Sequence, residues 1–131
     1  MIDTSALLAA LIGDHEHHQL ARPHLAAGTR VPAIVLAEAF AQFRRTFRQS
    51  AGVAAEGLAP WATRPQQMLA TSGTAVSTVL ARAVELDLAG NIHDALVAQV
   101  CLDNGLGLVT LDRRQHTIAL ALGAESTYLL A

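Results

Sequence analysis

The stretch Leu106-Gly107-Leu108-Val109-Thr110-Leu111-Asp112 decides the fold class of this chain. It is a short apolar run that begins among glycines and ends at an aspartate, a pattern that predicts a buried strand over 106–111. Similar short strands are predicted at 1–2, at 29–32, where Pro32 ends the strand, and at 128–130. Strands this short and apolar are typical of a sheet that is covered on both faces.

The segments between these strands have helical periodicity instead. It predicts helices over 5–11, 16–26, 34–48, 61–70, 77–86, 94–104 and 113–122. Gly105 and Gly123 follow two of them, as residues that end a helix commonly do. The segment 50–65 shows the weakest pattern, because glycines and prolines interrupt it. Short strands that alternate with longer helices predict an α/β sandwich around a mainly parallel sheet.

The composition indicates one domain over 1–131, long enough to bury a core. Cys101 is the only cysteine and lies in an apolar segment, which indicates a core thiol and a reducing compartment, hence the cytoplasm. No apolar run is long enough for a membrane span, and the first residues lack the basic region of a secretion signal. We therefore expect neither export nor membrane anchoring.

The charge of the chain limits how it could bind nucleic acid. The formal net charge is -2, so a strong overall positive field is excluded. All nine basic residues are arginines. The planar guanidinium can donate two hydrogen bonds to one phosphate, so local arginines could still contact an RNA backbone.

Four carboxylates are the candidate site residues: Asp3, Glu38, Asp94 and Asp112. The three aspartates fall at predicted junctions between a strand or loop and a helix, where an aspartate is favoured as a structural N-cap. The carboxyl ends of parallel strands are also where open α/β sheets gather their ligands. Both interpretations stay open for these three residues.

Glu38 requires a different explanation, since it lies inside the apolar helical segment 33–41. A buried glutamate needs a partner, because an isolated charge in a low-dielectric interior costs several kcal/mol. The segment therefore predicts a cation or a cleft beside Glu38. The alternative is a one-sided helix on which Glu38 faces water, which the neighbouring alanines would tolerate.

If the four carboxylates converge, they repel one another when ionised, and a divalent cation would relieve that repulsion. Carboxylate oxygens without histidine or thiolate favour hard ions, which indicates Mg²⁺ or Mn²⁺. A metal-bound water of lowered pKa is a nucleophile for phosphodiester hydrolysis. The residue types thus predict metal-dependent chemistry on a phosphodiester.

The order of these motifs resembles the PIN-domain ribonucleases, specifically the VapC-type toxins of bacterial toxin-antitoxin pairs. The resemblance spans nearly the whole chain and rests on Asp3-Thr4-Ser5, Glu38, His93-Asp94-Ala95-Leu96 and Thr110-Leu111-Asp112-Arg113-Arg114. It implies a PIN-like three-layer α/β/α sandwich and Mg²⁺- or Mn²⁺-dependent cleavage of single-stranded RNA, with 5′-phosphate and 3′-hydroxyl products. It also implies a cognate antitoxin protein and a homodimer or a toxin-antitoxin hetero-oligomer.

The resemblance also implies roles for individual residues. The metal ligands would be Asp3, Glu38, Asp94 and Asp112, with Asp94 also orienting the attacking water; Ser5 and Thr110 would be supporting polar groups, and His93, Arg113 and Arg114 possible RNA contacts. Many relatives have a further acid just after the last motif. This chain has Arg113, Arg114 and Gln115 there, so one firmly bound ion is expected.

Other patterns leave alternatives open. The segment 14–18, Asp-His-Glu-His-His, could bind a transition metal or could be an exposed helix start. Phe40, Phe43 and Phe47 form an apolar stripe that predicts core, or else a groove for an antitoxin helix.

The alternative to an enzyme is a non-catalytic PIN-like module that binds protein or RNA. A phosphoacceptor receiver domain is disfavoured, because it expects a distal lysine and the chain has none.

Overall fold

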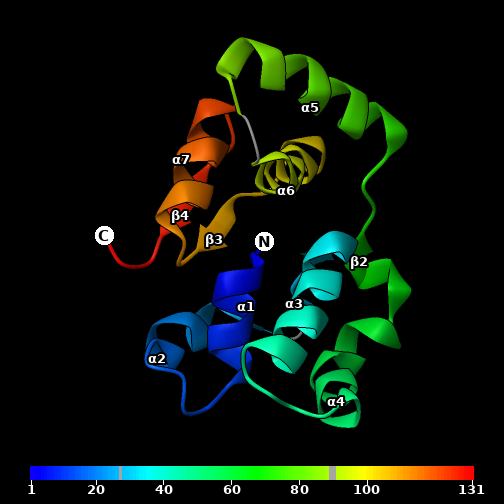
Figure 1. The fold of residues 1–131 in the computed structure, drawn as a ribbon, viewed down its shortest axis with the longest axis vertical. Helices are drawn as coiled ribbons and strands as arrows, with labels where there is room; N and C mark the ends of the chain where they lie inside the picture. Colours follow the sequence, from blue (N-terminus) through cyan, green and yellow to red (C-terminus); the bar gives the residue numbers. More distant parts are fainter. Residues whose placement is uncertain (27, 89–90) are drawn as a thin grey trace.

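The computed structural model describes residues 1–26, 28–88 and 91–131 and shows an α/β sandwich (Figure 1). Its helices are α1 (Thr4–Leu11), α2 (His18–Ala21), α3 (Ala33–Arg45), α4 (Ala51–Ala62), α5 (Gly73–Leu86), α6 (Ile92–Asp103) and α7 (Arg113–Ala121), with single 3-10 turns η1 (Arg22–His24) and η2 (Pro65–Gln67). Its strands are β1 (Val31–Pro32), β2 (Met68–Leu69), β3 (Leu108–Thr110) and β4 (Ser126–Tyr128). The predicted fold class is confirmed.

All strand pairs in the described ranges are parallel, as predicted. β3 pairs with β4 on one side, in the register Val109 to Thr127, and bridges Ile2 on the other. β1 and β2 form a second pair, with Val31 opposite Met68. Asp3 directly follows Ile2, and its backbone N–H donates to the Val109 carbonyl at 3.1 Å. The pairing therefore places the start of α1 beside the end of β3.

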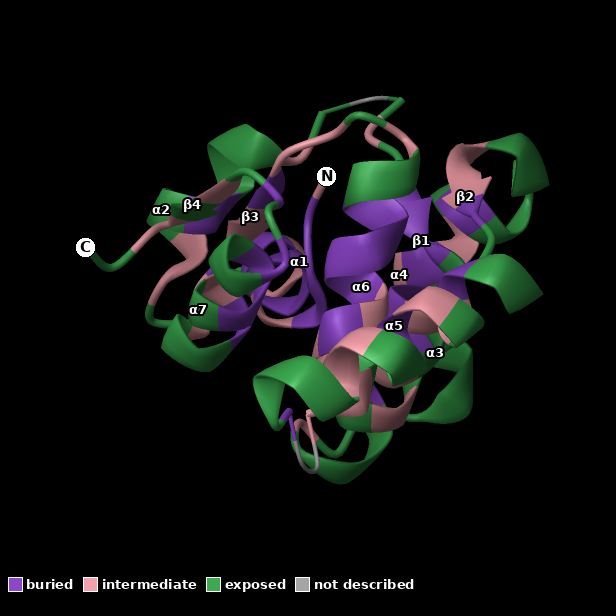
Figure 2. Ribbon diagram, turned by 90° about the horizontal axis from the view of Figure 1, so that it is seen from above, coloured by how far each residue is buried: buried purple, intermediate pink, exposed green. Residues whose placement is uncertain are grey.

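The core is built around α1 and α6, which Figure 2 shows mostly in the colour of buried residues. Alanines such as Ala6, Ala9 and Ala98 are completely buried, so these helices can pack closely against their neighbours. Cys101 is completely buried in α6, and burial raises the pKa of its thiol to about 12. The predicted core thiol is confirmed, and it stays protonated at neutral pH.

The prediction for 50–70 was wrong. The segment expected to be the least regular contains α4, capped at Ser50, whose hydroxyl accepts from the Val53 N–H. α4 forms because Ala54, Leu58 and Trp61 make one buried face, and this packing outweighs the glycines and the proline in the helix. The helix predicted over 61–70 is instead the end of α4, the turn η2 and the strand β2.

The prediction of one helix over 16–26 was also wrong. The His-rich segment forms turns in which the His17 N–H donates to Nδ1 of His15, and α2 begins only at His18. Pro23 then lies in η1. Within the described residues, no group of three or more His, Cys, Asp or Glu side chains could hold a metal ion, so the transition-metal alternative for 14–18 has no support.

The phenylalanine stripe of α3 is core only in part. Phe43 is buried, Phe47 is half-buried, and Phe40 is 38% exposed. α3 ends at Arg45, earlier than predicted, because Arg48 adopts a positive φ of 54° and the chain turns back there. The Phe47 N–H then bonds to the Gln42 carbonyl, which closes the end of the helix.

The longest helix in the described ranges, α5, has 14 residues. A helix needs about 20 predominantly apolar residues to cross a bilayer. None of the described helices is both long and apolar enough to do so.

Candidate active site

Asp3 lies at the N-cap of α1 and is only 4% exposed. Its Oδ1 accepts from the Ala6 N–H at 2.9 Å and from the Ser5 hydroxyl at 2.8 Å, and its Oδ2 accepts from the hydroxyl of Thr110. Burial raises the pKa of Asp3 to about 6, and the charge of Asp112 acts in the same direction. The three hydrogen bonds oppose that shift, so the carboxyl is held in place but is costly to ionise.

Thr110 and Ser5 connect Asp3 to the end of β3. The Thr110 side chain is completely buried and also accepts from the Asp112 N–H at 2.9 Å. The Ser5 hydroxyl accepts from the Leu111 N–H at 3.0 Å. These hydrogen bonds fix the relative positions of Asp3 and Asp112, and they are compatible with the supporting role predicted for both hydroxyl groups.

Replacing Thr110 by valine should lower the free energy of unfolding by about 2 kcal/mol, because the Asp3 carboxylate loses a donor and the Asp112 N–H loses an acceptor in a buried place. The pKa of Asp3 should rise further. Urea denaturation at neutral pH measures the loss. Thr117→Val is the control, since that exposed hydroxyl only donates to the Arg113 carbonyl within α7. Equal, small effects of both variants would contradict this account.

Glu38 is half-buried on α3, and its Oε2 accepts from the hydroxyl of Thr4 at 2.7 Å. The carboxylate is therefore neither sealed in the core nor pointed away into open water. It faces the start of α1, where Asp3 also lies. The expectation of a cleft beside Glu38 agrees with this position.

Asp94 is not a helix N-cap, contrary to one of the two sequence interpretations. Asn91 occupies the N-cap position of α6, and Asp94 lies in the first turn with its side chain 26% exposed. Burial raises the pKa of Asp94, and the charges of Asp112 and Glu38 raise it further, whereas Arg114 lowers it. Asp94 thus lies within the electrostatic reach of two other acids.

Asp112 is the N-cap of α7, and its Oδ1 accepts from the backbone N–H groups of Arg114 at 2.8 Å and Gln115 at 3.4 Å. The capping interpretation is confirmed for Asp112 and for Asp3. The position of both residues beside β3 also brings them to one edge of the sheet. Capping and a place in the site are therefore compatible for these two aspartates.

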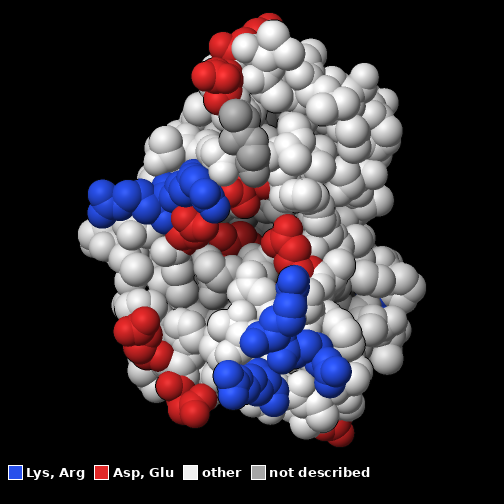
Figure 3. Space-filling view, viewed as in Figure 1, with Lys and Arg blue, Asp and Glu red and all other residues white. Residues whose placement is uncertain are grey.

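All four candidate carboxylates line one cleft of about 330 Å³. Figure 3 shows acidic side chains gathered in a hollow on this face of the molecule, with basic side chains on two sides of it. The remaining lining residues are Thr4, Ser5, Gln42, Val97, Arg114 and Gln115. Segments more than 100 residues apart in the chain contribute to this cleft, because Val109 of β3 pairs with Ile2 and so brings Asp112 close to Asp3.

The three possible RNA contacts are placed differently. Arg114 lines the cleft, and its Nε atom lies 3.7 Å from Oδ2 of Asp94. Arg113 instead stacks on the ring of Tyr128, 5.5 Å from its centre, and does not line the cleft. His93 is exposed and lines an adjoining hollow. Arg113 is therefore the weakest of the three candidates.

Sequence reasoning missed Thr4, Gln42 and Gln115 as residues of the cleft. Gln115 is 3% exposed, and its Nε2 donates to the backbone carbonyl of Asp94 at 3.0 Å, so it holds α6 against α7. Thr4 orients Glu38. The sequence carries a partial signal, because Thr4 and Gln115 lie next to recognised motif residues.

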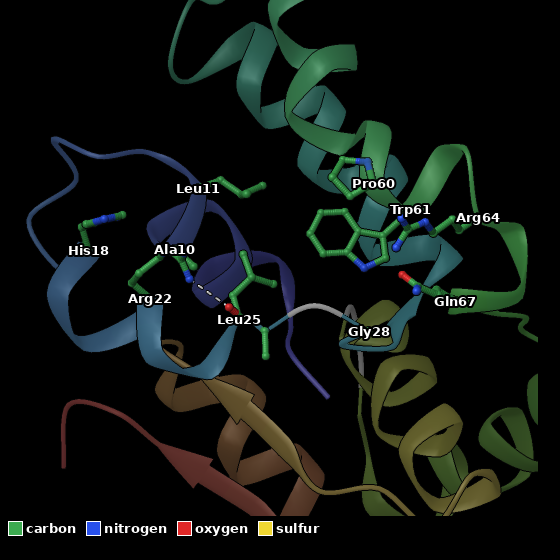
Figure 4. A pocket seen from close by; sticks show the side chains of 11 residues that line it. Ala10, Leu11, His18, Arg22, Leu25, Gly28, Pro60, Trp61, Arg64 and Gln67 are labelled. Atoms are coloured by element: carbon green, nitrogen blue, oxygen red, sulfur yellow. Dashed lines mark hydrogen bonds between the residues drawn. The ribbon is translucent and has the colours of Figure 1, made fainter.

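A larger hollow of about 460 Å³ lies elsewhere, between α1 and the end of α4 (Figure 4). Trp61, Leu11, Arg22 and Arg64 are among its lining residues, and none of the lining residues is an acid. The indole N–H of Trp61 already donates to the Thr29 carbonyl at 2.9 Å. His18 also lines this hollow, but its Nδ1 already contacts the Ala9 carbonyl at 2.9 Å and no carboxylate among the described residues lines the hollow, so the smaller acidic cleft is the candidate active site.

The donor set of the cleft suits a hard divalent ion, because it offers carboxylate oxygens without thiolate or imidazole. In the part of the chain that the structure describes, no three of these acids lie close enough together to form a closed metal cage. Magnesium keeps several waters and is held by one or two carboxylates, so an open cleft of this kind fits it.

The parallel strands, the helices around them and the four acids of one cleft define an α/β domain with an acidic site. A model of the PIN domain family matches residues 1–120, and the chain belongs to this family. PIN domains are generally nucleases, act on RNA and typically use divalent metal ions. A search of curated proteins finds no match to the chain.

Proposed function

We propose that the protein is a metal-dependent endoribonuclease and the toxin component of a VapC-type toxin-antitoxin pair. The observation that carries the nuclease proposal is the meeting of Asp3, Glu38, Asp94 and Asp112 in one cleft, although they come from four separate segments. Only two of the four cap a helix. The need for N-caps therefore does not explain why Glu38 and Asp94 face the same cleft.

The four carboxylates would hold Mg²⁺ or Mn²⁺, directly or through water. A bound ion of this kind lowers the pKa of a water molecule and stabilises charge on phosphate oxygens. The Asp94 carboxylate, 26% exposed at the cleft, would accept a hydrogen bond from the attacking water. Arg114, beside Asp94, would meet the phosphate of the substrate.

A cognate antitoxin, with assembly as a homodimer or hetero-oligomer, belongs to the same proposal. Its support is the resemblance to VapC-type toxins, together with exposed apolar side chains on α5, where Leu80 is 55% and Val84 is 85% exposed. Exposed apolar side chains that lie close together are typical of surfaces that bind another protein. Location in the cytoplasm remains a prediction from the composition.

The test is incubation of the purified, antitoxin-free protein with total cellular RNA in Mg²⁺ or Mn²⁺, with and without EDTA. New 5′ ends are then mapped by sequencing. We expect discrete cuts that disappear in EDTA and that leave 5′-phosphates. A folded protein that binds the metal but cuts no RNA would contradict the proposal and would favour the non-catalytic module, in which the acids serve as caps, as Asp3 and Asp112 do.

Replacing Glu38 by glutamine should weaken Mg²⁺ binding by about tenfold or more. The amide oxygen can still accept from Thr4, so the change removes a charge and keeps the hydrogen bond. Calorimetric titration with Mg²⁺ measures the affinity, and thermal unfolding in EDTA should show equal or higher stability, because repulsion with Asp94 is relieved. The control is Glu56→Gln on the exposed face of α4. An unchanged titration would remove Glu38 from the metal site.

A further inference from the structure

A second hollow adjoins the acidic cleft along α3. It has a volume of about 370 Å³, with an apolar floor formed by Ile34, Ala37 and Ala41. Arg45 and His93 also line it, and both are exposed. The hollow therefore combines an apolar surface with two groups that can donate hydrogen bonds to an anion.

The hollow lies directly beside the cleft. Glu38 and Gln42 line both of them, and they are one helical turn apart on α3. A linear polymer with one monomer bound at the carboxylates would thus have its neighbouring monomer over Ile34, Ala37 and Ala41.

The Arg45 guanidinium of this hollow suits a phosphate, whereas the Glu38 carboxylate lies on the side shared with the cleft. In the described part of the chain, the ion pairs join only Glu16 to His17 and Asp94 to Arg114, so the Arg45 guanidinium has no acidic partner within 4.0 Å. Figure 3 shows basic side chains reaching up to the acidic hollow from the side of α3. An unpaired guanidinium at this place is available for bidentate hydrogen bonds to a phosphate.

We infer that this hollow is the subsite for the nucleotide next to the cleaved phosphodiester. Arg45 binds its phosphate, and its base lies on the apolar floor beside the imidazole ring of His93. The inference rests on the proposed ribonuclease function and extends it to named residues that bind the substrate strand. Arg44 and Arg48, which also lie near the end of α3, do not line the hollow and are not assigned a part in it.

A nucleotide bound in this way must belong to a single strand. In an RNA duplex the bases are stacked and paired, and side chains reach mainly phosphates and 2′-hydroxyl groups. Only an unstacked base can lie flat on Ala37 and Ala41 while its phosphate contacts a neighbouring arginine. The hollow thus selects unpaired RNA by shape.

The first test compares Arg45→Ala with Arg44→Ala, which removes the same charge from the adjacent exposed position. Binding of a fluorescently labelled pool of short random single-stranded RNA is followed by anisotropy in Mg²⁺, with Asp94→Asn present in every protein to prevent cleavage. Arg45→Ala should weaken binding about fivefold and reduce the slope of log K against log salt by about 0.7, the value for one lost contact to a single strand. Arg44→Ala should change the affinity less than twofold.

The second test fills the hollow without changing charge. Ala37 is exposed, so Ala37→Trp should fold normally, yet its indole would occupy the floor of the hollow. We expect weaker RNA binding, together with slower cleavage when Asp94 is intact. Ala33→Trp, exposed on the same helix but outside the hollow, is the control.

The outcomes separate this inference from the proposed function. If the wild type cuts RNA in a metal-dependent way but Arg45→Ala and Arg44→Ala behave alike, or Ala37→Trp behaves like Ala33→Trp, the subsite is wrong and the nuclease stands. If the wild type cuts no RNA at all, the proposed function fails. RNA binding that depended on Arg45 but not on Arg44 would even then support a nucleotide site in this hollow.

Discussion

Asp94→Asn is expected to lower the rate of RNA cleavage by about 10³-fold or more and to leave the fold intact. The amide is a poor ligand for Mg²⁺ and no longer offers a charged acceptor to the attacking water. Loss of metal-based stabilisation is worth several kcal/mol of activation free energy, and each 1.36 kcal/mol corresponds to tenfold in rate. Asp94 should therefore show the largest effect on activity among single substitutions in the cleft.

The fold should survive this change because nothing structural depends on the Asp94 side chain. The N-cap of α6 is Asn91, and the group of Asp94 that binds Gln115 is its backbone carbonyl, which asparagine retains. Among the described residues its ion pair is with Arg114 at 3.7 Å, and because the Arg114 side chain is 67% exposed this pair is worth little. Relief of repulsion from Asp112 and Glu38 works in the opposite direction.

Cleavage of total RNA in Mg²⁺ measures the activity, and thermal unfolding in EDTA checks the fold. Asp14→Asn makes the same chemical change in an exposed turn outside the cleft and should leave cleavage unchanged. Full activity of Asp94→Asn would show that the site has been assigned wrongly. Inactivity combined with a large loss of stability would show that Asp94 is structural.

Without divalent metal, the protein should lose about 3 kcal/mol of unfolding free energy through Asp3 as the pH rises from about 4 to about 6. The pKa of Asp3 is about 6 in the folded protein, against an ordinary value of 3.8 in an unfolded chain. The folded protein therefore binds this proton more tightly than the unfolded chain. Ionisation in the folded state must overcome burial, which is the main cause of the raised pKa. Stability from this group is complete at low pH and declines with rising pH, levelling off above pH 6.

Denaturant unfolding in EDTA at several pH values measures this dependence. Asp3→Asn should remove it, because the amide oxygen can still accept from Ala6 and Ser5 and the Thr110 hydroxyl can rotate to accept from the amide. The quantity to compare is the difference between wild type and variant, since other carboxyl groups titrate in both. A difference that does not change with pH would mean that Asp3 ionises as easily in the folded protein as in the unfolded chain.

Divalent cation should reverse much of this cost. A cation beside Asp3 favours the ionised carboxylate, so the stabilisation by Mg²⁺ should grow as the pH rises toward neutrality. The same denaturation series with Mg²⁺ in place of EDTA measures it. In Asp3→Asn the gain from Mg²⁺ should be small and nearly independent of pH, if Asp3 belongs to the metal site.

Local patterns predicted the elements whose causes are local. The helix from Arg113 with its Asp112 cap and the ends at Gly105 and Gly123 follow from neighbouring residues, and the structure contains each of them. The strand predicted at 106–111 is also present, shortened to Leu108–Thr110. The prediction failed where packing outweighed local preference. α4 exists because Ala54, Leu58 and Trp61 become buried together, although the sequence there contains two glycines and a proline.

The sequence by itself determined which residues could carry chemistry: four carboxylates in a chain with few charges, three of them candidate N-caps, and a strand predicted to be buried. Only the tertiary structure decided that the four carboxylates line one cleft and that Asp94 is not a cap. It also decided that Arg113 packs on Tyr128, whereas Arg114 lies beside Asp94. The reason is physical. Capping and strand formation depend on adjacent residues, whereas the cleft depends on β3 pairing with Ile2 across more than 100 residues of chain.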